Sequence, residues 1–291
     1  MRVLLDTKDL IEVVERSRPL DVLALGTWLQ QRGARIVLTF TGVSDFVGPV
    51  FADRGDWLTM RGYLQGLEAL PIAYMREGLI IRDELELALR AYKIGQEPDP
   101  VDPYVSRWDE TADWGGKAAA TQILVGLRLD EIVHMARNVI QVAYKRHTPA
   151  LRDHLNWQRQ LPSSQRLPLR DIFVNAVPAR LKAYNLSDAN AVNLTAFGQW
   201  LWRRPSRSPG LRLQFETYHQ LRRDNAMVMQ EGDIADFAHI TALPYVHYAT
   251  VDKRIGDFLG KVLRKLGQNQ SSPFLSARVF TRLEDLLAQV P

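Results

Sequence analysis

Apolar runs that alternate with helical patterns dominate the first 45 residues of the chain. Residues 2–5 and 35–40 are short runs rich in aliphatic and β-branched side chains, which is typical of buried strands. Between them, apolar residues recur at helical spacing over 10–14 and 20–31, and Gly33 stands where a helix-ending glycine is expected. A strand, a helix and a second strand at this spacing predict parallel pairing through a right-handed crossover.

A similar alternation returns near the end of the printed sequence. The pattern predicts helices over 234–243, 254–266 and 283–290, and strands over 245–250 and 278–281. We therefore expect an α/β domain, with a parallel sheet flanked by helices, that is built from both ends of the chain.

The middle of the chain reads differently. Helical patterns fill 57–70 and 79–93, a proline-rich break follows at 98–103, and the patterns from 118 to 223 are helical with almost no strand signal. The sequence predicts three segments: the first part of the α/β domain over 1–110, a large all-helical insertion over 111–225, and the second part of the domain over 226–291.

Composition narrows the class of protein. Of the 291 residues, 46% are hydrophobic and 24% are charged, which is the balance of a folded globular protein. The absence of cysteine excludes disulfides, thiolate catalysis and cysteine-bound zinc. No stretch approaches the roughly 18 uninterrupted apolar residues of a membrane span, and the first residues resemble a strand rather than a secretory signal. We therefore expect a cytoplasmic protein that does not enter a membrane.

Charge is divided unevenly along the chain. Residues 111–225 hold 17 Lys and Arg against 8 Asp and Glu, whereas the remainder holds 20 against 25. A basic surface suits a polyanion and an acidic surface suits a cation. The sequence thus predicts a positively charged insertion on an acidic α/β domain.

Carboxylates follow several of the predicted strands. Asp6 follows the first strand, Asp45 the second and Asp252 the strand at 245–250, while Asp236 lies early in the preceding helix. Function gathers at the carboxyl ends of parallel strands, so we expect these acids to converge. A cluster of like charges is tolerated when a divalent cation neutralises it, and oxygen ligands favour Mg²⁺ or Mn²⁺.

Four segments carry a resemblance to a known family. The segments are Val3–Ile11, Ile36–Asp45, Asp233–His239 and Ala249–Ile255. In order and spacing they resemble the acidic motifs of PIN-like domain nucleases. The resemblance covers residues 1–50 and 230–291, weakens over 51–110 and is lost across 111–225.

The resemblance implies a metal-dependent nuclease. Asp6, Asp45, Asp236 and Asp252 would hold Mg²⁺ or Mn²⁺, whose water hydrolyses a phosphodiester bond. RNA is the favoured substrate and DNA the alternative. The accessory candidates at the same site are Asp233, His239 and Glu84.

Other readings of the same residues stay open. Lys8 stands where the family usually has a small residue or Asn, and Asp45 stands where it usually has Glu. A non-catalytic module that binds nucleic acid or protein is therefore the main alternative. An aspartate after a strand also serves as a helix cap or a turn residue, and we assign Asp9 and Asp257 such a structural role. A homo-oligomer stays open as well.

An arginine-rich segment stands out within the predicted insertion. Arg203, Arg204, Arg207 and Arg212 lie next to Trp200 and Trp202, and the segment also holds prolines and serines. Arginine binds phosphates and aromatic rings stack on bases, so these arginines are candidates for nucleic-acid binding. The alternative is a solvated loop whose tryptophans are core residues.

Overall fold

A six-stranded, mostly parallel sheet organises the chain in the computed structural model. The structure describes residues 1–15, 21–51, 55–107, 128–134, 160, 167–186, 189, 192–223, 239–267 and 277–291. The strands are β1 (Arg2–Leu4), β2 (Arg35–Thr39), β3 (Ile72–Met75), β4 (Tyr104–Val105), β5 (Tyr248–Thr250) and β6 (Arg278–Phe280). Their order is β4-β3-β2-β1-β5-β6, and β4 alone among them pairs antiparallel, to β3.

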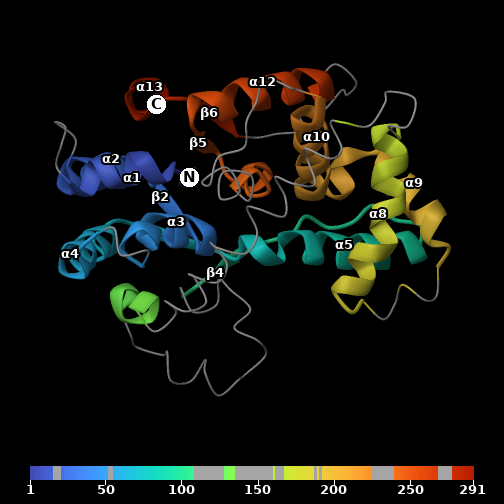
Figure 1. The fold of residues 1–291 in the computed structure, drawn as a ribbon, viewed down its shortest axis with the longest axis horizontal. Helices are drawn as coiled ribbons and strands as arrows, with labels where there is room; N and C mark the ends of the chain where they lie inside the picture. The colour runs from blue at the N-terminus through green and yellow to red at the C-terminus, as the bar shows by residue number, and fades with distance from the viewer. Residues whose placement is uncertain are drawn as a thin grey trace.

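Helices cover both faces of the sheet (Figure 1). One face packs against α1 (Thr7–Val14), α2 (Val22–Gln31), α3 (Phe40–Phe51), α4 (Trp57–Glu68) and α13 (Leu283–Gln289). The other packs against α5 (Glu77–Lys93), α10 (Pro209–Arg223), the short turn η5 (Leu243–Tyr245) and α12 (Lys253–Gly267). Because side chains alternate along each strand, β1 sends Val3 to the first core and Leu4 to the second.

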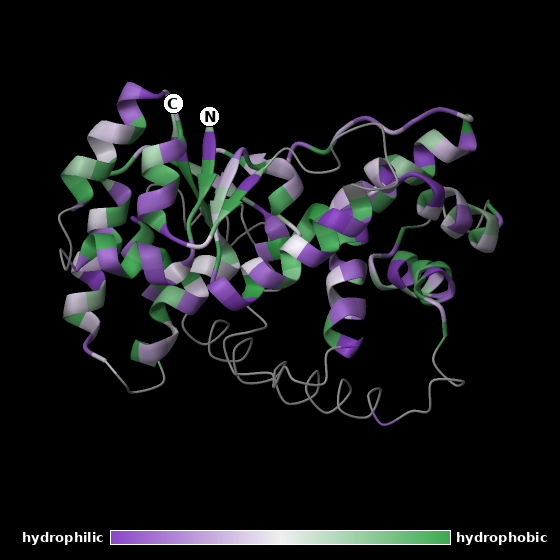
Figure 2. Ribbon diagram, turned by 90° about the horizontal axis from the view of Figure 1, so that it is seen from above, coloured by the Kyte–Doolittle hydropathy of each residue, from purple (hydrophilic) through white to green (hydrophobic). Residues whose placement is uncertain are grey.

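The helical part of the molecule extends to one side of the sheet (Figure 2). It contains α8 (Leu169–Ala183) and α9 (Leu194–Arg203), which share one hydrophobic cluster with α5 and with the start of α10. Since α5 and α10 also contribute to a sheet-covering core, they join the helical part to the α/β part.

The mixed α/β class is confirmed, with a sheet flanked by helices. The predicted strands before Asp6, Asp45 and Asp252 are all present, as is the strand at 278–280. The sequence patterns missed β3 and β4, and the predicted strand over 245–250 is shorter in the structure, where η5 ends at Tyr245 and β5 begins at Tyr248. In the described part of the chain no helix is long and apolar enough to cross a membrane.

Candidate active site

Asp6 lies where β1 ends and α1 begins. Its side chain caps α1 by accepting a weak hydrogen bond from the backbone N–H of Lys8, at 3.4 Å. Its own backbone N–H donates to Oγ1 of Thr250 at 2.8 Å, and Thr250 is the buried last residue of the neighbouring strand β5. This bond fixes Asp6 against the end of β5, two residues before Asp252.

Asp45 reaches the same region from a helix. The chain passes from β2 into α3 without a loop, so Asp45 lies in the second turn of that helix. Its carboxylate accepts a hydrogen bond from the Thr7 hydroxyl, and Thr7 directly follows Asp6. The first residues of α1 therefore bring Asp45 towards Asp6.

Asp252 stands just after β5 and is exposed. Its Oδ1 accepts from the backbone N–H of Arg254 at 2.7 Å, which stabilises the start of α12. The carboxylate thus combines the capping role with a position at the carboxyl edge of the sheet.

A buried histidine–glutamate pair adjoins these acids. Nδ1 of His239 lies 3.5 Å from Oε2 of Glu77, and the other oxygen of Glu77 accepts from the backbone N–H of Thr41 at 2.7 Å. These contacts hold the pKa of Glu77 below its ordinary value even though burial raises it. His239 also packs closely on Gly42, where an added Cβ would lie 3.1 Å from its ring.

Glu77 was not foreseen from the sequence. It begins α5, two residues after β3 ends, at the edge of the sheet where Asp6 and Asp252 also lie. Sequence patterns missed β3, so the acid beyond that strand carried no signal. A strand assignment at 72–75 would have revealed it.

The acids share one electrostatic environment. Burial raises the pKa of Asp6, and repulsion from Asp252 and Asp45 adds to it, while the Lys8 amide and the charge of His239 oppose it. Burial also raises the pKa of Asp45 against its bond from Thr7. Asp6, Asp252 and His239 line a common pocket of about 20 Å³, enough for a water molecule or an ion.

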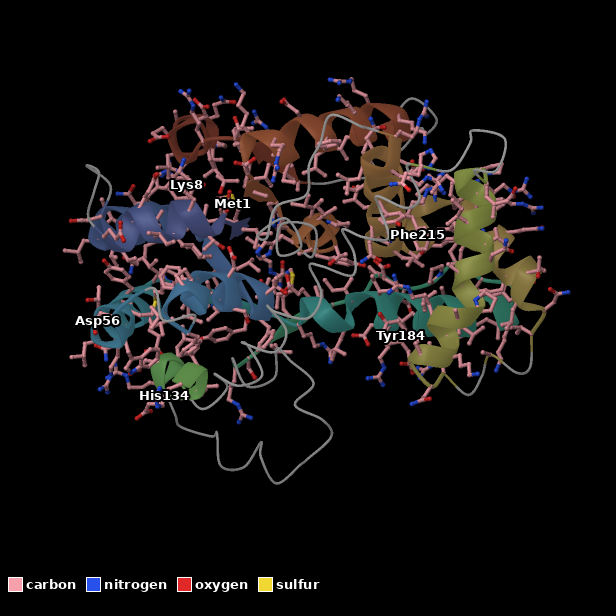
Figure 3. The ribbon with its side chains drawn as sticks, viewed as in Figure 1. Met1, Lys8, Asp56, His134, Tyr184 and Phe215 are labelled. Atoms are coloured by element: carbon pink, nitrogen blue, oxygen red, sulfur yellow. The ribbon has the colours of Figure 1, made fainter. Side chains whose placement is uncertain are left out.

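Two further charged residues of α1, Asp9 and Lys8, lie near these acids. Burial raises the pKa of Asp9 to about 6; its carboxylate accepts from the Thr250 hydroxyl and is repelled by Asp6. The side chain of Lys8, labelled in Figure 3, is 76% exposed and lies 4.0 Å from Glu12. Lys8 is thus engaged on the outside of α1.

Glu84 serves a different place in the fold. It is buried, and its carboxylate accepts from the backbone N–H groups of Gly210 and Leu211 at 2.6 and 2.9 Å and from the hydroxyl of Tyr245 at 2.5 Å. Burial raises its pKa to about 7. Glu84 of α5 therefore binds the first backbone N–H groups of α10 and the Tyr245 hydroxyl of η5, and so connects these three elements.

The donor chemistry of the site suits a hard divalent cation. The remaining predicted acids, Asp233 and Asp236, lie outside the described residues. Within the described ranges, no group of three or more acidic or histidine side chains is close enough to hold an ion by itself. Mg²⁺ commonly binds through one or two carboxylates, and Asp6 and Asp252 both line the pocket described above.

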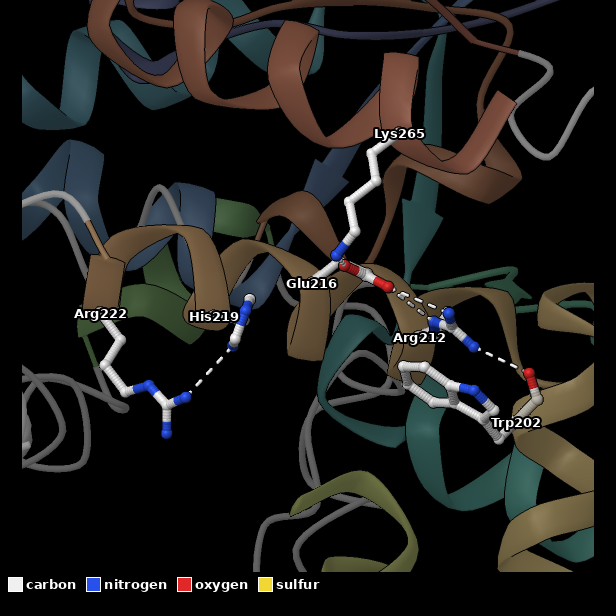
Figure 4. A network of polar contacts seen from close by, with 6 residues as sticks. All are labelled: Trp202, Arg212, Glu216, His219, Arg222 and Lys265. Atoms are coloured by element: carbon white, nitrogen blue, oxygen red, sulfur yellow. Dashed lines mark hydrogen bonds and ion pairs between the residues drawn. The ribbon is translucent and has the colours of Figure 1, made fainter. Parts of the chain in front are cut away.

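The arginine-rich segment is largely folded into the protein. Arg212 is buried, and its guanidinium donates to Glu216 and to the carbonyl of Trp202 (Figure 4). Its Cζ lies 3.4 Å from the centre of the Trp202 ring. Lys265 of α12 donates to the other oxygen of Glu216. Such an arginine is not accessible to a phosphate backbone.

Arg207 is held in the same way. It is buried, donates to Glu97 and the Trp200 carbonyl, and lies 3.7 Å above the Trp200 ring. Arg204 shares Glu97 but is 63% exposed, and Arg203 is exposed at the end of α9. The segment therefore leaves two of the four predicted arginines at the surface, and the tryptophans form stacks within the fold.

Comparisons with known proteins add no relative. No family model, no curated protein and no solved structure matches the chain. The resemblance to PIN-like nucleases accordingly rests on the four short motifs and stays a prediction.

Proposed function

We propose that this chain is a metal-dependent nuclease that hydrolyses phosphodiester bonds, with RNA as its favoured substrate. The observation that supports the proposal is the position of Asp6 beside Asp252 at the carboxyl edge of the parallel strands: the Asp6 backbone N–H donates to Thr250 at the end of β5, and both aspartates line one pocket. Asp6 is partly buried, and repulsion from Asp252 adds to the rise of its pKa, so a bound cation would stabilise its charged form.

The residues of the site would have different roles. Asp6 and Asp252 would hold Mg²⁺ or Mn²⁺, with Asp45 and Asp236 as further oxygen donors. When bound, the ion lowers the pKa of a coordinated water and offsets charge at the phosphorus. His239, which lies 3.5 Å from Glu77 and lines the same pocket, would donate a hydrogen bond to a phosphate oxygen.

Cleavage of labelled single-stranded RNA in Mn²⁺ tests the proposal. Asp6→Asn and Asp252→Asn should each abolish cleavage, because asparagine keeps a capping oxygen but removes the charge. Asp257→Asn is the matched control, since Asp257 is exposed on α12 beyond the site, and it should cleave at the wild-type rate. Equal cleavage by all of these proteins, or none by the wild type in any divalent ion, would overturn the proposal.

A non-catalytic binding module is the second candidate. It is favoured by Lys8 and Asp45, which depart from the residues usual at these positions of the PIN-like pattern. This alternative predicts RNA binding that is the same with Mn²⁺ and with EDTA, and no cleavage under either condition. The same assay with single-stranded DNA shows whether RNA or DNA is the substrate.

A further inference from the structure

The opposite edge of the sheet holds a second cavity. Parallel strands begin at one edge and end at the other, so the start of β1 lies away from the acids that follow it. A cavity of about 490 Å³ opens there, near Met1, which Figure 3 labels. Its lining includes Arg2, Arg35, Tyr74, Tyr104 and His247.

Positive charge is concentrated on one side of this cavity. Arg2 of β1 and Arg35 of β2 are direct partners in the parallel register, and like charges placed opposite each other destabilise a sheet. Each lies two residues before a member of the same core cluster, Leu4 and Val37, so both side chains leave the same face. The described residues that line the cavity include no acid to offset them.

The polar groups are held in place before any ligand arrives. The guanidinium of Arg2 lies 3.4 Å from the centre of the Tyr104 ring, and the Tyr104 hydroxyl donates to the carbonyl of Tyr245 at 2.6 Å. Nδ1 of His247 accepts the backbone N–H of Arg2 at 3.2 Å, so the neutral ring carries its proton on Nε2 as a donor. Burial and nearby positive charge lower the pKa of His247, which favours this neutral form.

We propose that this amino-edge cavity binds a nucleotide, with its phosphate held by Arg2 and Arg35 and its base stacked on the exposed side of the Arg2–Tyr104 pair. The volume is within the range of small-molecule sites and far exceeds the needs of a lone phosphate. A planar guanidinium that is stacked on one side offers its other side to an aromatic base. The same chemistry fits a free mononucleotide and the phosphorylated end of a nucleic-acid strand.

Calorimetric titration of the full chain in EDTA tests the site without cleavage, so its outcome is independent of the nuclease proposal. The probes are AMP, adenosine, inorganic phosphate, and a five-residue oligoadenylate with or without a 5′-phosphate. AMP or the phosphorylated oligomer should bind at least about tenfold more tightly than adenosine, phosphate or the unphosphorylated oligomer. Binding of AMP identifies a free nucleotide, and binding of the phosphorylated oligomer alone identifies a strand end.

Substitutions locate the binding. Arg35→Gln should weaken binding about tenfold, and because Arg35 is exposed this variant should stay folded. Arg278→Gln is the matched control. Arg278 begins β6 at the same edge of the sheet, contacts Gln289 and does not line the cavity. The affinity of this variant should differ from that of the wild type by less than about twofold. Equal weakening by both variants, equal affinity for phosphate and AMP, or no binding by any probe would overturn the proposal.

Discussion

Glu84 provides the sharpest test of the packing between the sheet and the helical part. It is a buried carboxylate that receives three hydrogen bonds, from Gly210, Leu211 and Tyr245, and burial raises its pKa from 4.5 to about 7. Between these values the folded protein keeps a proton that the unfolded chain has lost. The free energy of unfolding therefore falls as pH rises through this window.

The magnitude follows from the shift. One pKa unit corresponds to about 1.4 kcal/mol, so the contribution of Glu84 to the free energy of unfolding should fall by about 2–3 kcal/mol between pH 5 and pH 8. Glu84→Gln removes the titration. At pH 5 Glu84 is protonated in the folded protein, and glutamine replaces the hydroxyl of the acid, which can still accept from a backbone N–H, with an NH₂ group that can only donate. The variant should therefore lose about 1–3 kcal/mol at pH 5. That loss should shrink or reverse by pH 8.

Urea unfolding of the wild type and of Glu84→Gln at several pH values measures this difference. Glu86→Gln is the control on the same helix: Glu86 is partly exposed, and it pairs with Arg90. Its profile should run parallel to that of the wild type. A Glu84→Gln profile that is also parallel to the wild type would refute the assignment of a proton to buried Glu84.

Four further substitutions test the structure at other points. Arg212→Ala should lower the free energy of unfolding by about 3 kcal/mol, because it leaves buried Glu216 with one partner fewer. Arg204→Ala, at the exposed end of the segment, should change it by less than about 0.5 kcal/mol. Chemical denaturation measures both values. Gly42→Ala should cost about 1–3 kcal/mol and slow any cleavage, since its Cβ would press on the imidazole of the site; an unchanged melting temperature would contradict this contact. Gly62→Ala, where an added Cβ meets nothing within 4 Å, should instead stabilise α4 by about 0.5–1 kcal/mol in the same melts.

The sequence predicted the parts of the fold that follow local patterns. The strands before Asp6 and Asp252 and the amphipathic helix after Asp252 were readable because their apolar periods are regular. Strand β3 was missed because four residues after a proline carry too little pattern. Glu77, just after this strand, was therefore not predicted either, and its partner His239 lies 162 positions further along the chain.

The arginine-rich segment shows a second limit of sequence reasoning. A dense run of arginines near tryptophans has the composition of a nucleic-acid contact, yet Arg207 and Arg212 are neutralised inside the fold. Glu216 stands four residues after Arg212, a spacing typical of a helical ion pair, and this signal was readable. Glu97, the partner of Arg207, is distant in sequence and could be identified only from the tertiary structure.

The proposed nuclease activity depends most directly on the binding of a divalent cation by Asp6 and Asp252. Titration of Mn²⁺ into the full chain, followed by the electron paramagnetic resonance signal of the free ion, measures this directly. The wild type and Asp257→Asn should take up Mn²⁺ alike, and the double variant Asp6→Asn, Asp252→Asn should leave the ion free. Equal uptake by the double variant and the wild type, or no uptake by the wild type, would contradict the claim.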